Sequence, residues 1–342
     1  MGPKVTSHDV ARRAGVSRTT VSMVINNYSA VTLSAATRER VLKAAAELGY
    51  QPNSAGRMLV RGDTETIGLV IGDRRILPFD AFVPHMLYGI GMVNRQHGYH
   101  VLLEGFDPSG EPASYQSLVD SRRIDGLIVL NPRPDDPELR ALIDRGFPLV
   151  LAGSVGKPNE YAVDIAPRAG LTAAVDYVMS LGHRRIGTVP FSGRDSSTVD
   201  VRVAGLRTAL EERGLELLES DIEAADFSAE SGALAAARLL ARRPDLTAIF
   251  AGNDTIAIGV ISAAMRLGKD VPNDLSIVGF DDLPFAAYLS PPLTTIRTDA
   301  FQQGAKAAEM LVQILKGAHL EERHLRIETE LVVRATCATA RS

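Results

Sequence analysis

The 342-residue chain contains one cysteine, Cys337, and no tryptophan. A single cysteine excludes an internal disulfide and is typical of a protein in a reducing compartment. No apolar run approaches the roughly 18 residues that a membrane-spanning helix needs; the nearest, residues 256–265, is too short. The N-terminus also lacks a hydrophobic signal segment. We therefore expect a cytoplasmic protein without a membrane partner.

The sequence also lacks recognisable catalytic and metal-binding motifs. No glycine-rich phosphate loop ending in Lys-Ser/Thr is present, and the lone cysteine has no metal-ligand spacing. His183 is the histidine most easily imagined as a catalyst, but it lies between a predicted helix end and a predicted strand start. That position favours a role in capping the helix. We expect no enzymatic activity, no cofactor and no metal.

Positive charge is concentrated at the N-terminus. Residues 1–62 hold nine Lys/Arg and three acidic residues, a balance of +6, which leaves −10 for the remainder of a chain whose total is −4. A basic segment on an acidic body suits a protein that contacts DNA phosphates, which supply most of the affinity of such complexes. A merely solvated basic surface is the alternative.

Two short helices are predicted within this basic segment. The spacing of Thr6 and Asp9 is that of a capping box, in which each residue satisfies the other's backbone amide. Gly15 can adopt positive φ in the turn that follows, and Ser17 can cap the second helix. The pattern of the second helix directs one face inward (Val21, Val24, Ile25) and another outward (Arg18, Thr19, Ser22, Met23). The pair indicates either an ordinary helical hairpin or a helix-turn-helix whose second helix enters the major groove.

A third helix is predicted to complete this small all-α domain. Ser34 is its expected N-cap and Gly49 its expected end. We expect its inward face to consist of Val41, Leu42, Ala45 and Leu48.

The residues around these helices closely resemble the lactose-repressor (LacI/GalR) family of bacterial transcription regulators. The matching residues are Val5-Thr6, Asp9-Val10-Ala11, Ala14-Gly15-Val16-Ser17, Thr20-Val21-Ser22, Asn26, Thr37-Arg38-Glu39-Arg40-Val41 and Leu48-Gly49-Tyr50-Gln51-Pro52-Asn53. The resemblance implies that residues 53–59 form a hinge helix that folds only on DNA, with Leu59 wedged into the minor groove. We expect DNA to be contacted by Thr6, Ser17, Arg18, Thr19, Thr20, Ser22, Met23, Asn26, Tyr50, Asn53, Arg57 and Leu59.

Three departures from the family affect this DNA-binding prediction. Met23 stands where the family often has a base-contacting Arg or His, so that base preference cannot be transferred; a methionine can instead touch a thymine methyl. The loop over residues 26–33 is longer than usual. Gly56 replaces the usual alanine of the hinge helix, at a cost of roughly 1 kcal/mol in helix stability.

Beyond a polar linker at residues 61–66, short apolar strands alternate with amphipathic helices. Strands are predicted at 67–71, 101–103, 127–130, 149–152, 186–189, 248–251, 276–280 and 330–333, and helices near 84–97, 112–122, 136–145, 168–181, 200–213, 229–242, 254–267 and 299–316. This alternation predicts an α/β fold of parallel sheets covered by helices on both faces. The strands and helices fall into two successive sets, which indicate two lobes.

The second part of the chain also resembles the same family, whose effector domain is two-lobed and periplasmic-binding-protein-like. The matches include residues 178–186, 202–205, 253–259, 271–282 and 291–296. We expect an N-terminal all-α helix-turn-helix domain (1–52), a hinge helix and linker (53–65), and an effector-binding and dimerisation domain (66–342). Lobe one is expected at about 66–164 and 295–322, and lobe two at about 165–294 and 323–338.

A small ligand is expected in the cleft between the carboxyl ends of the strands of the two lobes. Polar groups lie just beyond predicted strand ends, and the resemblance implies that Arg202, Asn253 and Asp281 contact the effector. Guanidinium, amide and carboxylate groups together can satisfy many hydroxyls. We interpret Asp254 and Asp282, in contrast, as helix caps or local structure.

The first lobe matches the family less well. Phe82, in the segment aligned with the family's Asn-Pro-Phe-Phe motif, can stack on a sugar face or pack in the core. Ala166-Pro167 occupies the place of the family's Asp-Asn, so a usual ligand acid is missing, and Asp164 either replaces it or does not. Without tryptophan, stacking on the ligand is limited to Phe and Tyr.

These features predict a sequence-specific transcriptional regulator. The expected partners are a roughly palindromic double-stranded operator, a second copy of the chain, and a small effector of the sugar class. The resemblance favours a repressor released by its effector, although a corepressor mechanism and a tetramer stay open. The alternative is a sugar-binding protein with the same body fold, which would require a secretory signal and no helix-turn-helix.

Overall fold

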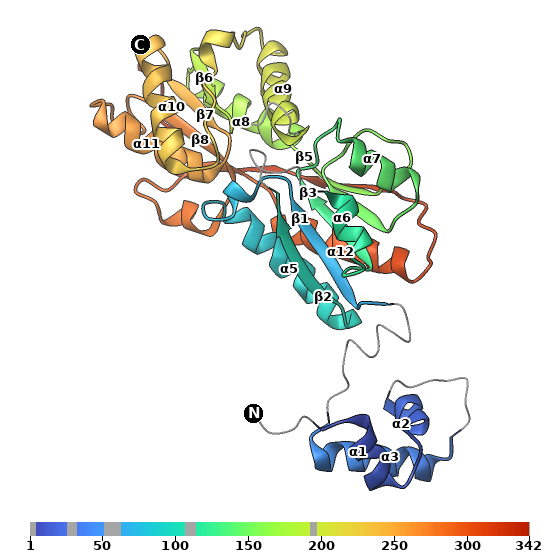
Figure 1. Ribbon diagram of the computed structural model, residues 1–342. Helices are drawn as coiled ribbons and strands as arrows, with labels where there is room; N and C mark the ends of the chain where they lie inside the picture. The colour runs from blue at the N-terminus through green and yellow to red at the C-terminus, as the bar shows by residue number, and fades with distance from the viewer. Residues whose placement is uncertain (1–4, 26–32, 51–62, 107–113, 192–196, 342) are drawn as a thin grey trace. The chain divides into compact units, whose positions relative to one another are not determined.

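The computed structural model describes residues 5–25, 33–50, 63–106, 114–191 and 197–341 (Figure 1). The chain separates into two compact units, Met1–Thr64 and Glu65–Ser342. No helix in the described part of the chain combines the length and apolarity needed to cross a membrane.

The described part of the first unit is a domain of three helices. Its helices are α1 (Ser7–Ala14), α2 (Arg18–Ile25) and α3 (Ala35–Leu48). The predicted capping box is present, because Asp9 N donates to Thr6 Oγ1 at 3.4 Å and Thr6 N donates to Asp9 Oδ2 at 3.0 Å. Gly15 takes a φ of +65° in the turn before α2, where a side chain would be strained.

A small core holds these three helices together. Val10, Val21, Val24 and Val41 are buried in it. The prediction that Leu42 also faces inward was wrong, since 48% of its surface is exposed. The inner stripe of α3 runs through Val41, Ala44, Ala45 and Leu48. Leu42 lies one position outside this helical repeat, which places it on the outer face.

The second unit contains two sheets, each the centre of one lobe. The first sheet has the order β10-β5-β4-β3-β1-β2 and is parallel throughout. Its strands are β1 (Thr66–Ile71), β2 (His100–Gly105), β3 (Gly126–Leu130), β4 (Leu149–Ala152), β5 (Ala162–Ala166) and β10 (His324–Glu328). The second sheet has the order β11-β9-β8-β7-β6, with β11 antiparallel. Its strands are β6 (Ile186–Val189), β7 (Ala248–Ala251), β8 (Ser276–Asp281), β9 (Thr294–Arg297) and β11 (Glu330–Val332).

Helices cover both faces of each sheet, as predicted (Figure 1). In lobe one, alternate residues of β1 point to opposite cores: Leu69 packs with α5 and α12, and Val70 packs with α6 and α7. The helices of this lobe are α5 (Phe82–His97), α6 (Tyr115–Asp120), α7 (Pro137–Asp144) and α12 (Ala300–Leu315), and those of lobe two are α8 (Arg168–Ser180), α9 (Ser197–Glu211), α10 (Ala229–Arg242) and α11 (Asp254–Arg266). Three 3-10 turns accompany them: η1 (Arg74–Ile76), η2 (Glu219–Asp221) and η3 (Pro284–Tyr288).

Helices α5 and α12 approach each other very closely through glycine. A Cβ placed on Gly89 would lie 2.2 Å from the Phe301 carbonyl oxygen, and one on Gly304 would lie 2.2 Å from the Met86 carbonyl oxygen. These two positions therefore exclude any side chain. The contact joins an early helix of the chain to the last one and closes lobe one.

The chain passes between the lobes three times, and the predicted lobe boundaries were wrong at these passages. Strand β9 lies in lobe two, although residues from 295 onward were assigned to lobe one, and β10 lies in lobe one, although residues from 323 onward were assigned to lobe two. Strand β5 runs across the predicted boundary at 164. Residues 324–328 alternate between exposed and buried positions, so this strand lacks the continuous apolar run that identified the central strands.

Two of the passages are tied together by Thr329. Its hydroxyl donates to the carbonyl of Ala166, the last residue of β5, at 3.0 Å and accepts from Gly170 N at 3.1 Å. The third passage, between β9 and α12, is fixed by Arg297, which forms ion pairs with Asp282 at 2.7 Å and Glu330 at 2.6 Å. The three connections are thus linked by side-chain contacts.

Candidate DNA-contacting helices and effector cavity

Helix α2 has the predicted cap, and its faces follow the prediction in part. Ser17 Oγ accepts a hydrogen bond from Thr20 N at 3.1 Å and shares a second one with Thr20 Oγ1 at 2.9 Å. Arg18 and Thr19 are exposed, while Val21 is buried against the other helices. The exposed face is therefore available for an external partner. Ser22 and Met23 are half-buried on this helix.

Two other predicted DNA contacts have structural roles in the domain. The hydroxyl of Thr6 donates to Asp9 Oδ2 at 2.7 Å within the capping box. Tyr50 is half-buried against the three-helix core, and its backbone N–H donates to the Ala45 carbonyl at 2.9 Å. The predicted contacts Asn26, Asn53, Arg57 and Leu59 lie outside the described residues, as does Gly56.

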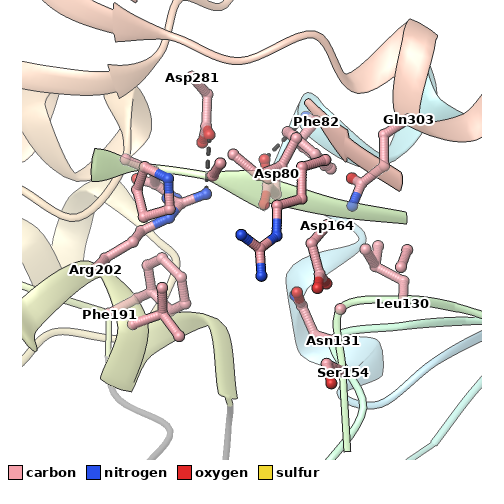
Figure 2. A pocket seen from close by; sticks show the side chains of 18 of the residues that line it. Asp80, Phe82, Leu130, Asn131, Ser154, Asp164, Phe191, Arg202, Asp281 and Gln303 are labelled. Carbon is pink, nitrogen blue, oxygen red and sulfur yellow. Dashed lines mark hydrogen bonds and ion pairs between the residues drawn. The ribbon is translucent and has the colours of Figure 1, made fainter. Parts of the chain in front are cut away.

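A cavity of about 350 Å³ lies between the two lobes (Figure 2). A volume of this size is ordinary for a small-molecule site. Its lining combines aromatic, acidic, basic and amide side chains from both lobes: Asp80, Phe82, Leu130, Asn131, Ala152, Gly153, Ser154, Asp164, Ile165, Ala166, Pro167, Arg168, Phe191, Val201, Arg202, Phe227, Asn253, Asp281, Gln303 and Arg326. All four predicted effector contacts are among them.

Arg202 and Asp281 form the charged centre of the lobe-two wall. Arg202 Nη2 lies 3.1 Å from Asp281 Oδ1, and Nη1 donates to the Gly252 carbonyl at 2.7 Å. The guanidinium also lies over the Phe280 ring, 3.9 Å from its centroid. Burial raises the pKa of Asp281, and the nearby Arg202 charge opposes that rise. Asp281 has a φ of +105°, a strained backbone for an aspartate that is typical of functional sites.

Asn253 serves both the fold and the cavity. Its Oδ1 accepts from Ile256 N at 2.7 Å and so caps α11. Its Nδ2 is buried and has no hydrogen-bond partner among the described residues. Gln303 is arranged the opposite way, since its Nε2 donates to the Val163 carbonyl at 2.7 Å and its buried Oε1 is the atom left without a described partner. The cavity wall thus offers one unused donor and one unused acceptor.

Aromatic rings supply the apolar part of the wall. Phe82 is 8% exposed and belongs to the lobe-one core while also lining the cavity, so core packing is one of its roles and stacking on a ligand stays a prediction. Phe191 and Phe227 stack with ring centroids 4.7 Å apart. Sequence reasoning missed these two rings, although Phe191 lies two residues beyond the end of β6, where ligand contacts are expected.

Two acidic residues of lobe one also line the cavity. Asp80 is 9% exposed, and burial together with the nearby Asp281 charge raises its pKa to about 6. Asp164, whose role the sequence left open, is half-buried on the wall, and burial raises its pKa as well. Asp80 lies in the aligned motif and could have been selected because its neighbour Phe82 was.

Asp254 and Asp282 are structural, as predicted. Asp254 accepts from Leu283 N at 2.7 Å and from the Thr295 hydroxyl at 2.6 Å. Asp282 forms ion pairs with Arg297 and Arg334. Neither carboxylate lines the cavity.

His183 is likewise occupied by structural contacts. Its backbone N–H donates to the Val178 carbonyl at 3.1 Å, beyond the end of α8. Its ring nitrogens lie 3.0 Å from Thr247 Oγ1 and 2.9 Å from the Ala338 carbonyl oxygen. Burial lowers the pKa of this histidine, which favours its neutral form. Across the described ranges of the chain, no group of three or more His, Cys, Asp or Glu is arranged to hold a metal.

Comparison with known families and proteins agrees with this two-part architecture. A model of the bacterial regulatory proteins of the lacI family matches residues 6–53, and a model of the periplasmic binding protein-like domain matches residues 175–337. The HTH-type transcriptional regulator CelR of Thermobifida fusca is 34% identical over 330 residues, covering 95% of this chain and 96% of the relative. The HTH-type transcriptional repressor CytR of Escherichia coli K12 is 32% identical over 335 residues, covering 97% and 96%.

Solved structures agree over almost the whole length of the chain. A complex of the transcriptional regulator CelR with cellobiose is 32% identical, covers 97% of this chain and 100% of its own, and has a TM-score of 0.73. The lac repressor dimer bound to operator and the anti-inducer ONPF is 28% identical, covers 98% and 100%, and has a TM-score of 0.86. The chain therefore belongs to the lacI family of bacterial regulatory proteins, transcriptional regulators that join a helix-turn-helix DNA-binding domain to a periplasmic-binding-protein-like domain.

Proposed function

We propose that this regulator is a homodimeric repressor whose affinity for a roughly palindromic operator is lowered by a small molecule bound between its lobes. The observation that carries this proposal is the convergence of Arg202, Asn253 and Asp281 on one cavity of a chain that also holds a capped helix-turn-helix. The related lac repressor structure, a dimer with operator and anti-inducer, supports the same division of roles.

DNA recognition is assigned to α2 and the segments around it. The exposed Arg18 and Thr19 belong to the face that would enter the major groove. We propose contacts from Thr6, Ser17, Arg18, Thr19, Thr20, Ser22, Met23, Asn26, Tyr50, Asn53, Arg57 and Leu59. The positive charge of residues 1–62 would supply the phosphate contribution to affinity. In a dimer, two such helices would read two half-sites.

Effector binding is assigned to Phe82, Arg202, Asn253 and Asp281. These side chains come from both lobes, so a ligand that contacts them all favours one degree of lobe closure over others. Closure would alter the linker that leads to the hinge segment at residues 53–59, and with it the pairing of two hinge helices on DNA. Because two sites act on one equilibrium, operator and effector must change each other's affinity by the same factor.

The remaining assignments follow from this role. We propose that the chain acts in the cytoplasm, where bacterial DNA lies. We propose no enzymatic step, since the polar side chains of the cavity are arranged as hydrogen-bonding groups and the histidine His183 is occupied by structural contacts.

The proposal is tested by selecting duplexes from a random DNA pool with the purified full chain at two salt concentrations. A two-fold symmetric site with a flexible central step is expected, and it would provide an operator for effector screening. Weak, sequence-blind binding with steep salt dependence would contradict the proposal, because it would show phosphate contact without base recognition. A ligand that strengthens operator binding would reverse the proposed sign to corepression.

A further inference from the structure

Three acids (Asp80, Asp164, Asp281) and three arginines (Arg168, Arg202, Arg326) line the cavity, but they are not evenly paired. Asp281 is paired with Arg202. Arg168 forms its ion pair with Glu212, and its own side chain is 77% exposed. Arg326 lies close enough to Asp164 to lower the pKa of that carboxyl, against the effect of burial. Among the described residues, the cation that acts on Asp80 is again Arg202, which is therefore shared between two acids, Asp80 and Asp281.

Asp80 lies in a position that disfavours the ionised form of its carboxyl group. It is 9% exposed, and its one hydrogen bond within the described chain comes from Phe82 N at 2.9 Å. It belongs to lobe one, whereas Asp281 and Arg202 face it from lobe two (Figure 2). Arg202 already donates to Asp281 and to the Gly252 carbonyl. A buried carboxylate beside a second carboxylate needs a counter-charge or a proton.

A proton does not meet this need at neutral pH. With a pKa of about 6, Asp80 is mostly ionised at pH 7. The ionised Asp80 then shares the Arg202 charge with Asp281, and a cation that enters the cavity would offset the excess of negative charge. The unused acceptor Gln303 Oε1 and the carboxylate of Asp164 add to this demand for donors, while Asn253 Nδ2 is an unused donor on the opposite lobe.

We propose that the effector of this regulator carries a protonated amine, which binds to Asp80 between the two lobes, with hydroxyl or carbonyl oxygens facing Arg202 and Asn253. An amino sugar or a similar amino polyol has this chemistry. The inference rests on the proposed effector site and narrows its ligand class. Asp80 becomes the residue that selects an ammonium group over a neutral hydroxyl, because a charged donor binds a buried carboxylate more strongly than a neutral one.

The first test needs no ligand. Because the pKa of Asp80 is raised on folding, its contribution to stability is fully present below its unfolded value, the ordinary 3.8, and is lost as pH rises through about 6. Thermal unfolding of the full chain from pH 5 to pH 8 should show Asp80→Asn gaining several degrees over wild type at the upper end only. Asp73→Asn, which alters an acid paired with Arg75 outside the cavity, serves as the control and should follow the wild-type profile. Parallel profiles for wild type and Asp80→Asn would overturn the proposal.

The second test compares amines with matching hydroxyl compounds: glucosamine with glucose, galactosamine with galactose, and serinol with glycerol, all at equal ionic strength. For any pair that stabilises the wild type, the amine should bind about tenfold more tightly at pH 7.5. That preference should disappear in Asp80→Asn. It should also shrink in the wild type as pH falls below 6, because protonation removes the charge.

A neutral compound that binds more tightly than its amine partner, or an amine preference that survives in Asp80→Asn, would overturn the ligand class. If no compound stabilises the wild type, the ligand-free pH profiles of wild type and Asp80→Asn decide whether the proposal stands. Operator affinity, measured on the same wild-type preparation, tests the proposed regulator separately from the proposed ligand class. If the wild type binds its operator specifically but Asp80→Asn changes neither the pH profile nor the amine preference, the amine ligand is refuted and the proposed regulator stands.

Discussion

Arg202 and Asp281 meet at 3.1 Å on the wall of the cavity, and both side chains are largely withdrawn from water. Removal of one member of such a buried pair strands the other charge, which typically costs about 3–5 kcal/mol. The pair is therefore both a binding element and a support of lobe two. Substitutions at Asp281 must be designed to separate these two roles.

Asp281→Asn should abolish the effector response while leaving operator affinity nearly unchanged. The amide keeps an acceptor for Arg202 and for the Thr298 hydroxyl, which lies 3.2 Å away, but loses the charge that binds the ligand. Asp281→Ala should give the same loss of response with a larger fall in melting temperature. Loss of operator binding by a folded Asp281→Asn protein, measured by fluorescence anisotropy, would show that the residue acts only in the fold.

Asn253→Ser should weaken effector binding without a large loss of stability. Serine is as good an N-cap as asparagine, so the cap on α11 is kept while the unused donor Nδ2 is removed. Asn253→Ala removes both and should lose about 1 kcal/mol of unfolding free energy in addition. Calorimetric titration beside denaturant unfolding checks both quantities. Equal effector affinities for wild type and Asn253→Ser would show that the side chain is a cap and nothing more.

Gly89→Ala should destabilise lobe one by about 3 kcal/mol or more, because its methyl group would meet the Phe301 backbone, which cannot move aside as a side chain can. Gly91 provides a matched control in the same helix, since a Cβ there meets nothing within 4 Å. Gly91→Ala should leave stability unchanged or raise it by up to about 1 kcal/mol. Urea unfolding of the two variants decides the matter, and similar midpoints would contradict the tight α5–α12 contact.

Gly56→Ala should tighten operator binding. Alanine favours a helix over glycine by roughly 1 kcal/mol, which corresponds to about a fivefold change in affinity if the hinge folds on DNA. Fluorescence anisotropy with the selected operator measures this directly. Unchanged or weaker affinity would argue against a hinge helix limited by glycine.

Much of the fold could be predicted because its signals are local. The central strands are continuous apolar runs, and the caps at Thr6, Ser17 and Ser34 satisfy backbone amides within their own segments. Strands β5, β9 and β10 escaped prediction because their sequences, AVDIA, TTIR and HLRIE, lack the continuous apolar run of the central strands, and the lobe of β10 depends on a partner far away in the chain. The pairing of β10 with β5, for example, joins residues 324–328 to 162–166.

The site could be predicted where its residues lie at or beyond the ends of predicted strands. Arg202, Asn253 and Asp281 were found in this way and from the family resemblance. Gln303 was not, because it lies within α12 and reaches the cavity only through the packing of that helix on lobe one. The sharing of Arg202 between Asp80 and Asp281 was also hidden, since it depends on which acids each arginine faces in the folded chain.

The three passages between the lobes also fix the order in which the protein can be completed on the ribosome. Lobe one lacks α12 and β10 until residue 328 has emerged, and lobe two lacks β11 until residue 332. The described core of the three-helix unit, by contrast, lies within the first fifty residues. During synthesis the core of the helix-turn-helix unit therefore precedes two lobes that both become complete within the final stretch of translation, and it remains without them until then.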